Sequence, residues 1–270
     1  IAFEDLNTWN AFRVCKRLNL PFYASEKQLQ LTSNKSLFKK FCREYGIPVT
    51  EEYPVNSVNE LEKIDSSAYP IIVKPSDNYG SKGITVCHDL PMVQDAYKKA
   101  ISFSKQRSVI AERFFTGYGV VMYYTVINGI PYLSAIADRY VFQQGSSAPP
   151  LPTATIFPSR HISDYCNEMN DNVKGMIRGL RIKNGVLLFQ SVLNKGSLLL
   201  YEMAYRLSGE QHYHIIKEET GVDLLGMMIE LAINGKINNQ YTIEKYDNNC
   251  LPYPACNLAI LLKKGRIRKI

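Results

Sequence analysis

The sequence lacks the features that mark disulfide-rich, zinc-binding and membrane proteins. Its six cysteines lie far apart among 270 residues, and no two of them form a C-x-x-C pair. We therefore expect reduced thiols, as in cytoplasmic proteins, and neither a disulfide framework nor a zinc site. No apolar run reaches the roughly 18–20 residues that cross a bilayer, and no signal peptide is recognisable. These absences predict a cytoplasmic protein that does not bind a membrane.

Positive charge is in excess but is not concentrated on one segment. The formal net charge is +7 and the pI is about 9.0. Apart from the last residues, 263–269, the lysines and arginines are spread along the chain. Nucleic-acid binders more often carry a basic stripe interleaved with aromatic residues. We therefore expect no nucleic-acid partner, and we attribute the excess charge to attraction for small anions.

Common catalytic patterns are also missing. No Ser-His-Asp or Cys-His spacing stands out, and the P-loop pattern G-x-x-x-x-G-K-[ST] does not occur. The length and the apolar content of 46% allow one large domain or two small ones. Because the first residue is isoleucine, we expect the chain to be part of a longer protein whose remaining segments are missing at both ends.

Residues 69–86 carry the strongest chemical signal in the chain. A short β-branched strand ends at Lys74, a polar turn follows over residues 77–83, and a second β-branched run leaves it. Gly80 and Gly83 allow backbone amides to approach an anion, and Lys74 supplies a positive charge beside them. The stretch predicts a flap over a phosphate tail. From these residues alone, a solvated hairpin with a lysine at its edge is an equally open interpretation.

Periodicity predicts a mixed α+β chain. Helical spacing occurs at residues 5–18, in a segment that has Lys35 in its first turn and ends near residue 46, and at residues 90–104, 163–180, 212–219 and 222–234. Thr32 or Ser33 is the expected N-cap before Lys35. Two hairpins are predicted at residues 120–138 and 185–206, the first joined by Asn128-Gly129. The Gly/Ser/Pro-rich residues 144–153 are predicted to form a loop.

A series of short motifs occurs in a fixed order along the chain. They are Asn34-Lys35 at a helix start, Tyr-Pro-Ile-Ile-Val-Lys-Pro at 69–75, Gly-Ser-Lys-Gly-Ile at 80–84, Ala-Glu-Arg-Phe-Phe at 111–115, Asn-Gly-Val-Leu-Leu-Phe-Gln at 184–190, Tyr-Glu-Met-Ala-Tyr-Arg-Leu-Ser-Gly at 201–209 and Thr-Gly-Val-Asp-Leu at 220–224. Over about residues 30–270 this order resembles an ATP-grasp domain, closest in style to those of carbamoyl-phosphate synthase large chains and carboxylate–amine ligases.

The resemblance implies an α+β, ATP-grasp fold in which two lobes with antiparallel sheets clasp the nucleotide. It divides the chain into four parts: residues 1–30 as the remnant of a preceding domain and a linker helix, 31–113 as the N-terminal lobe with the flap, 114–237 as the C-terminal lobe, and 238–270 as closing strands of that lobe.

Carried over residue by residue, the resemblance assigns a nucleotide site. It implies phosphate contacts from Lys35 and Lys74, flap contacts from Tyr79, Gly80, Ser81 and Gly83, adenine or ribose contacts from Glu112, Arg113 and Phe114, magnesium ligation by Glu202 and Gln190, and catalytic roles for Lys74 and Arg206. Arg139, at the end of a strand of the second lobe, is a further candidate for the triphosphate. An ion pair between Asp138 and Arg139 on the surface is the equally open alternative, and a structural bridge between Glu202 and Arg206 is the alternative to metal ligation.

This sequence departs from the pattern of the family at three positions. Gln190 stands where family members usually have Glu, and Ala204 stands where they have Asn. An acidic residue that is common after the segment between the two lobes, matched here by Glu112 to Phe114, is missing around Tyr118. The resemblance implies an ATP-dependent ligase that uses ATP and Mg²⁺, phosphorylates a carboxylate or bicarbonate to an acylphosphate, and transfers the acyl group to an amine. Its partners are then small-molecule acyl and amine substrates. The departures leave open a catalytically weak nucleotide-binding module of a larger enzyme.

Overall fold

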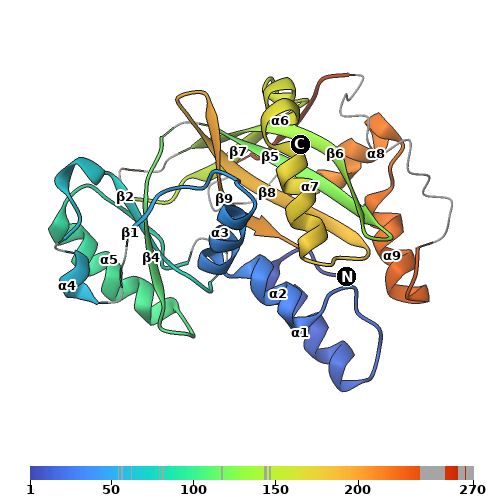
Figure 1. Cartoon of the computed structure of the whole chain (residues 1–270), viewed down its shortest axis with the longest axis horizontal. Helices are drawn as coiled ribbons and strands as arrows, with labels where there is room; N and C mark the ends of the chain where they lie inside the picture. The colour runs from blue at the N-terminus through green and yellow to red at the C-terminus, as the bar shows by residue number, and fades with distance from the viewer. Residues whose placement is uncertain are drawn as a thin grey trace.

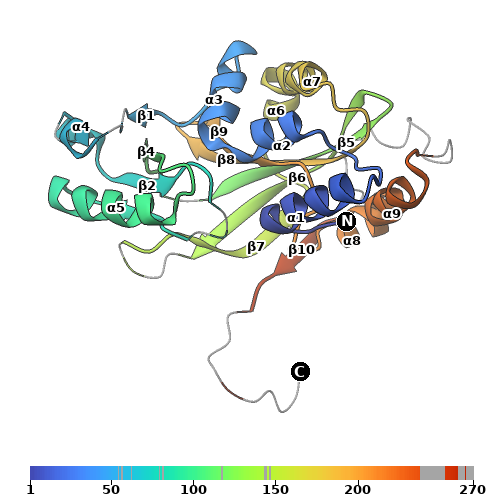
Figure 2. The same cartoon turned by 90° about the horizontal axis from the view of Figure 1, so that it is seen from below.

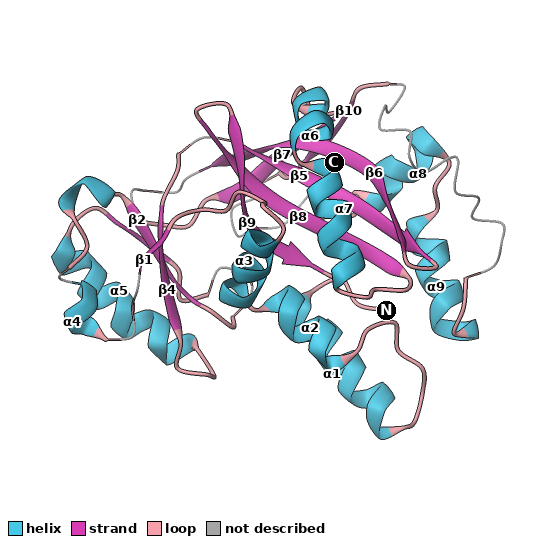
Figure 3. Cartoon of the chain, in the orientation of Figure 1, coloured by secondary structure: helices cyan, strands magenta, loops and turns pink. Residues whose placement is uncertain are grey.

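Two antiparallel sheets organise the chain (Figures 1 and 3). The computed structural model describes residues 1–53, 55, 57–61, 63–78, 80, 82–116, 118–142, 145, 147–237, 253–260 and 265. Within these residues the smaller sheet has the order β1 (Glu52–Tyr53), β4 (Val109–Arg113), β2 (Ile71–Pro75), β3 (Thr85–Cys87). The larger sheet has the order β10 (Ala255–Leu258), β7 (Leu151–Phe157), β6 (Ile130–Phe142), β5 (Gly119–Ile127), β8 (Gly185–Asn194), β9 (Ser197–Ala204). The α+β class with antiparallel sheets is thus confirmed.

Helices cover both faces of the larger sheet (Figure 2). One face packs against α2 (Glu26–Ser33), α3 (Lys35–Glu44), α6 (Ile162–Glu168) and α7 (Asn170–Gly179), with α1 (Asp5–Arg17) at the edge of that core. The other face packs against α8 (Tyr213–Thr220) and α9 (Leu224–Asn234). The smaller sheet has a separate apolar core with α4 (Val58–Leu61), a 3-10 turn (Ser66–Ala68) and α5 (Leu90–Phe103).

Alternation along β2 and β4 gives the smaller sheet one apolar face and a second, mixed face that carries Lys74 and Glu112. Ile71, Val73 and Ala111 lie in its apolar core. Successive side chains of a strand point to opposite faces, so Lys74 and Glu112 point away from that core. This alternation, which is readable from the sequence, places both charged side chains on the face that looks toward the larger sheet.

Both predicted hairpins are present. β5 and β6 are joined through Asn128 and Gly129, whose φ angles of 50° and 85° suit the left-handed turn that the pair predicts. β8 pairs with β9 as expected. The helices predicted at 5–18, 90–104, 212–219 and 222–234 are found as α1, α5, α8 and α9.

Some local predictions are wrong. The helix α2 was not foreseen, and Thr32 and Ser33 lie inside it, where their hydroxyls donate to backbone carbonyls one turn back. The N-cap of α3 is instead Asn34, whose Oδ1 accepts from the N–H of Leu37 at 3.0 Å. The helix predicted at 163–180 is two helices that meet at Met169.

The strand β7 begins at Leu151, inside the predicted loop 144–153. Its Pro152 pairs with Val141, next to a register shift in β6 between Tyr140 and Val141. Proline is tolerated in sheets at such irregularities, which explains why the Pro-rich composition did not exclude a strand here.

The division of the chain into lobes at residue 113 stays a prediction. The described residues of the proposed closing segment include β10, which pairs with β7. Residues 238–252 and most of 261–270 lie outside the described residues. α3, in the segment predicted as the N-terminal lobe, packs against the larger sheet, and the backbone of Thr50 and Pro48 bonds to that of Leu200 in β9. In the part of the chain that the structure describes, no helix is long and apolar enough to cross a membrane.

Candidate functional site

A cleft of about 290 Å³ lies between the two sheets and is lined by residues of both. Its walls carry five cationic and three anionic side chains: Lys35, Lys74, Arg113, Arg139 and Arg206, against Asp5, Glu112 and Glu202. An excess of fixed positive charge in a concave, partly desolvated site favours an anionic ligand. The fold thus brings most of the residues predicted to contact the nucleotide to one cleft, although they lie far apart in the sequence.

Glu112 lies at the centre of a buried charge cluster in this cleft. Its Oε1 is 2.7 Å from the Nζ atoms of both Lys74 and Lys39, and its Oε2 accepts from the Thr50 hydroxyl at 2.9 Å. Burial would raise the pKa of Glu112, but the two ammonium groups outweigh it and lower the pKa to about 2. Burial lowers the pKa of Lys39 to about 8, although Glu112 opposes this. The Glu112 carboxylate is therefore charged and fixed at neutral pH.

Lys35 and Glu202 form the second ion pair of the cleft. Lys35 is the first residue of α3, and its Nζ is 3.1 Å from the Oε1 of Glu202 on β9. The same Nζ donates to the carbonyl of Asn78 in the predicted flap at 3.2 Å. Burial would lower the pKa of Lys35, but Glu202 outweighs it and raises the pKa. This lysine therefore joins α3, the flap and the larger sheet at one point.

Gln190 and Glu202 lie directly opposite each other in the β8–β9 pair, and both line the cleft. Paired residues of neighbouring strands share a face of the sheet, so the two side chains have the placement that joint metal ligation requires. The Oε1 of Gln190 accepts from the Tyr201 hydroxyl at 2.6 Å. Among the described residues there is no group of three or more His, Cys, Asp or Glu that could hold a metal.

The donor set fits a magnesium ion only in part. Glu202 offers a carboxylate, Gln190 offers an amide oxygen, and Ala204 lines the cleft without a ligand atom. Magnesium demands oxygen ligands and commonly takes several from water and nucleotide phosphates. Glu202 and Gln190 are therefore the residues that would hold such an ion, together with the oxygens of a bound nucleotide.

The two glycines of the flap have different environments. Gly80 lines the cleft with a φ of 65° and has open space where a side chain would be. Gly83, with a φ of 78°, is instead packed so closely that an added Cβ would lie 2.9 Å from the Cβ of Phe103. Gly80 thus has the placement that a phosphate contact requires, whereas Gly83 is needed for packing. The predicted contacts Tyr79 and Ser81 lie outside the described residues.

Two backbone N–H groups of the segment that follows Glu112 already form hydrogen bonds within the protein. The N–H groups of Arg113 and Phe114 donate to the carbonyls of Glu51 and Pro70 at 3.0 and 2.9 Å. Arg113, Phe114 and Phe115 all line the cleft. These two amides are therefore not available to a ligand base. A base bound against this segment would contact its carbonyl groups and the chain beyond Phe114.

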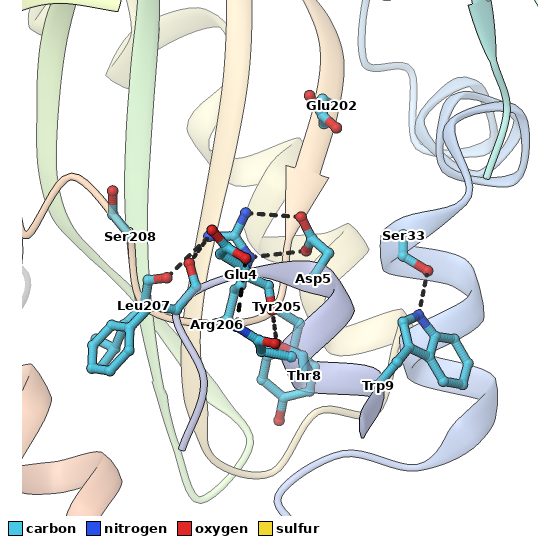
Figure 4. Close-up of polar contacts among 12 residues, drawn as sticks. Glu4, Asp5, Thr8, Trp9, Ser33, Glu202, Tyr205, Arg206, Leu207 and Ser208 are labelled. Atoms are coloured by element: carbon cyan, nitrogen blue, oxygen red, sulfur yellow. Dashed lines mark hydrogen bonds and ion pairs between the residues drawn. The ribbon is translucent and has the colours of Figure 1, made fainter. Parts of the chain in front are cut away.

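Arg206 is held by the N-terminal segment, which the sequence did not suggest (Figure 4). Its Nε and Nη2 donate to the two carboxylate oxygens of Asp5 at 2.9 and 2.8 Å. Its Nη1 donates to the carbonyls of Phe3 and Leu207, both at 3.1 Å. Because Arg206 pairs with Asp5 and Glu202 pairs with Lys35, the alternative of a structural Glu202–Arg206 bridge is wrong. Asp5 is the first residue of α1, whose N-cap is Glu4.

A second cavity of about 210 Å³ adjoins the cleft and shares Arg139, Gln190 and Arg206 with it. Its wall also contains Glu210. Asp138 pairs with Arg160 at 2.8 Å, so the alternative of an Asp138–Arg139 ion pair is wrong. Arg139 makes one hydrogen bond among the described residues, a long one of 3.5 Å to Tyr201, and it lines both cavities.

Sequence reasoning missed three members of the site. Lys39 follows Lys35 by four residues on the same helix, and residues with this spacing share a helix face, so this signal was available. Thr50 and Asp5 had no such signal. Asp5 lies 201 residues from its partner Arg206, and no local pattern connects the two.

Known proteins share both the sequence and the fold of this chain. It is 29% identical over 205 residues to cyanophycin synthetase of Crocosphaera subtropica, covering 69% of this chain and 22% of that protein. It is 24% identical over 239 residues to phosphoribosylamine–glycine ligase of Clostridium acetobutylicum, covering 82% and 55%. The crystal structure of an L-amino acid ligase from Bacillus licheniformis matches its fold with a TM-score of 0.74 at 19% identity, covering 93% and 59%.

This chain is therefore shorter than the proteins it matches. It spans 22% and 55% of the length of the two curated relatives and 59% of the solved structure. The family model for the carbamoyl-phosphate synthase L chain, ATP binding domain, matches residues 34–240. That match covers most of the chain, including α3, the strands of both sheets that line the cleft, and Arg206, which lies two residues after the end of β9. The chain belongs to the family of the carbamoyl-phosphate synthase L chain ATP-binding domain, and its fold is the ATP-grasp fold.

Proposed function

We propose that this protein is an ATP-dependent ligase that activates a carboxylate, or bicarbonate, as an acylphosphate and passes the acyl group to an amine. The observation that carries the proposal is the cleft between the sheets, in which Lys35, Lys74 and the pair Glu202 and Arg206 come from three separate segments to line one anion-attracting site. Membership of an ATP-binding family supports ATP as that anion.

In this proposal, Lys35 and Lys74 neutralise the phosphate oxygens, and the backbone at Gly80 closes over them. Glu112, fixed by Lys39, Lys74 and Thr50, accepts a hydrogen bond from the base or ribose. Phosphoryl transfer depends mainly on positioning and charge neutralisation, which these fixed cations provide. Magnesium, when bound through Glu202 and Gln190, supplies further neutralisation of the phosphate charge.

The second cavity is the proposed site of the acyl substrate. A carboxylate there would face Arg139, whose donors are largely uncommitted within the described residues, and would lie beside the phosphate end of the cleft. Its oxygen attacks the terminal phosphorus, so that ADP leaves and an acylphosphate forms. The amine nitrogen then attacks the acyl carbon, inorganic phosphate leaves, and the nitrogen loses a proton.

A screen for ADP release tests this proposal. The protein is incubated with Mg·ATP and combinations of amino acids, bicarbonate and small carboxylates with amines, and ADP is measured. We expect ADP to form only with a matched acyl and amine pair, and hydroxylamine to replace the amine and yield a hydroxamate. The Lys74→Ala variant serves as the background control.

The alternative function is a nucleotide-binding module with little turnover. The specific observation in its favour is the reduced ligand set, in which Gln190 and Ala204 stand where family members have charged or polar ligands. Saturable ATP binding without ADP release for any pair in the screen would support this alternative and count against the ligase.

A further inference from the structure

We propose that Asp5 is a positioning residue of the site, which fixes the guanidinium of Arg206 at the junction of the two cavities. The proposal rests on the function proposed above, because it takes the cleft to hold a nucleotide with its phosphates at Lys35 and Lys74. Asp5 lies outside residues 34–240, the region that the family match covers. The role therefore belongs to a segment that precedes that region.

The contacts of Arg206 leave its side chain with one orientation. An arginine has five N–H donors in a planar fork. Four hydrogen bonds, two to Asp5 and one each to the carbonyls of Phe3 and Leu207, occupy all but one N–H on Nη2. The bidentate geometry with Asp5 is the strongest of these contacts, since two charge-assisted bonds share one plane. Asp5 therefore sets the direction of the remaining N–H of Arg206.

The orientation of Arg206 is important because the residue lies where the two cavities meet. Arg206 lines both the main cleft and the second cavity, so a donor there reaches the boundary between nucleotide and acyl substrate. Other carboxylates line the same cavities, Glu202 in the main cleft and Glu4 and Glu210 in the second cavity. Without Asp5, Arg206 is free to turn toward one of them. A pair with Glu202 would remove both the arginine and the proposed metal ligand from the phosphates.

The N-terminal segment is anchored independently of Asp5. The indole of Trp9 donates to the Ser33 hydroxyl at 3.3 Å, and Phe3 packs against Tyr213 with ring centroids 5.9 Å apart. The hydroxyl of the buried Thr8 donates to the carbonyl of Glu4 at 2.9 Å. Figure 4 shows Asp5 and Trp9 on the same helix, each directed at a different partner. A change at Asp5 is therefore expected to act on Arg206 and to leave the helix in place.

Two nucleotides test the proposal, because one has and the other lacks the terminal phosphate that Arg206 would face. Affinities for Mg·ADP and for Mg·AMP-PNP, which cannot transfer its terminal phosphate, are measured by calorimetry for wild type, Asp5→Asn, Arg206→Lys and the double variant. We expect Asp5→Asn to weaken Mg·AMP-PNP by about fivefold to tenfold and to change Mg·ADP by less than about twofold. Because Asp5 acts through Arg206, the double variant should be no weaker than Arg206→Lys alone.

Two further variants make the result interpretable. Glu26→Gln removes a carboxylate from an exposed ion pair with Lys16 between α1 and α2, and it should leave both affinities unchanged. Asp5→Glu keeps the charge but moves it by one methylene, so it should show a smaller loss of the same kind, and it replaces Asp5→Asn if that variant does not fold.

The proposal is overturned if Asp5→Asn weakens both nucleotides equally, changes neither, or adds its full effect to that of Arg206→Lys. Equal losses would indicate a structural role. A wild-type protein that binds neither nucleotide would refute the proposed function itself. Binding of both without ADP release would refute turnover and leave the comparison of the variants valid.

Discussion

Replacement of Lys74 by alanine is expected to weaken Mg·ATP binding by about tenfold or more and to change adenosine binding by less than about twofold. Lys74 is buried, its Nζ lies 2.7 Å from Glu112, and it lines the cleft where the phosphates are proposed to bind. Adenosine has no phosphate, so its binding does not depend on this contact. Glu112 keeps Lys39 and Thr50 as partners, so the carboxylate is not left unpaired by the change.

Calorimetric titrations of both ligands into each variant measure this effect. Lys74→Met tests whether the lost volume of the side chain contributes to the loss of affinity, since methionine keeps most of the length of lysine without the charge. Lys98→Ala is the matched control, because Lys98 is 70% exposed and its nearest partner, Asp95, is 3.5 Å away. Equal losses for ATP and adenosine would mean that Lys74 supports the fold of the site and does not hold phosphate.

The second large effect is expected at the proposed metal ligands. Gln190→Glu should tighten magnesium-dependent ATP binding by about tenfold, because it gives a hard dication a second carboxylate. The Tyr201 hydroxyl, which donates to Gln190 at 2.6 Å, can donate equally to a glutamate. Glu202→Gln should abolish most of the magnesium dependence. It should not weaken ATP binding without magnesium, because it removes a negative charge that pairs with Lys35.

ATP titrations with and without magnesium distinguish these outcomes. Asn194→Asp supplies the same amide-to-carboxylate change at the end of β8 and should leave the magnesium dependence unchanged. If Glu202→Gln keeps the full magnesium dependence, Glu202 is not the ligand. If Gln190→Glu weakens binding instead, the two side chains repel each other without an ion between them.

Much of the arrangement of the cleft follows from local sequence patterns. Alternation in Ile71–Pro75 and Val109–Arg113 places Lys74 and Glu112 on one face, and the hairpin that contains Gln190 and Glu202 pairs them directly. Family resemblance then identified which charged residues belong to one site. These patterns are of short range, and each is fixed by the period of a strand or helix.

The contacts that the sequence did not predict join segments far apart in the chain. Asp5 and Arg206 are 201 residues apart, and no local pattern predicts which carboxylate an arginine selects. The same holds for Thr50 and Glu112, which meet because β1 and β4 are neighbours in the smaller sheet. The commitment of Arg113 and Phe114 amides to Glu51 and Pro70 likewise depends on the way the chain enters and leaves that sheet.

Thermal unfolding of the wild-type protein in rising Mg·ATP tests the central claim, that ATP binds between the two sheets. A ligand that binds only the folded state stabilises it by about 2.7 kcal/mol at a hundred times its Kd. For a chain of this size we therefore expect the melting temperature to rise by roughly 5–10 °C, with adenosine giving a smaller shift. An intact protein whose melting temperature does not move at millimolar Mg·ATP would contradict the account.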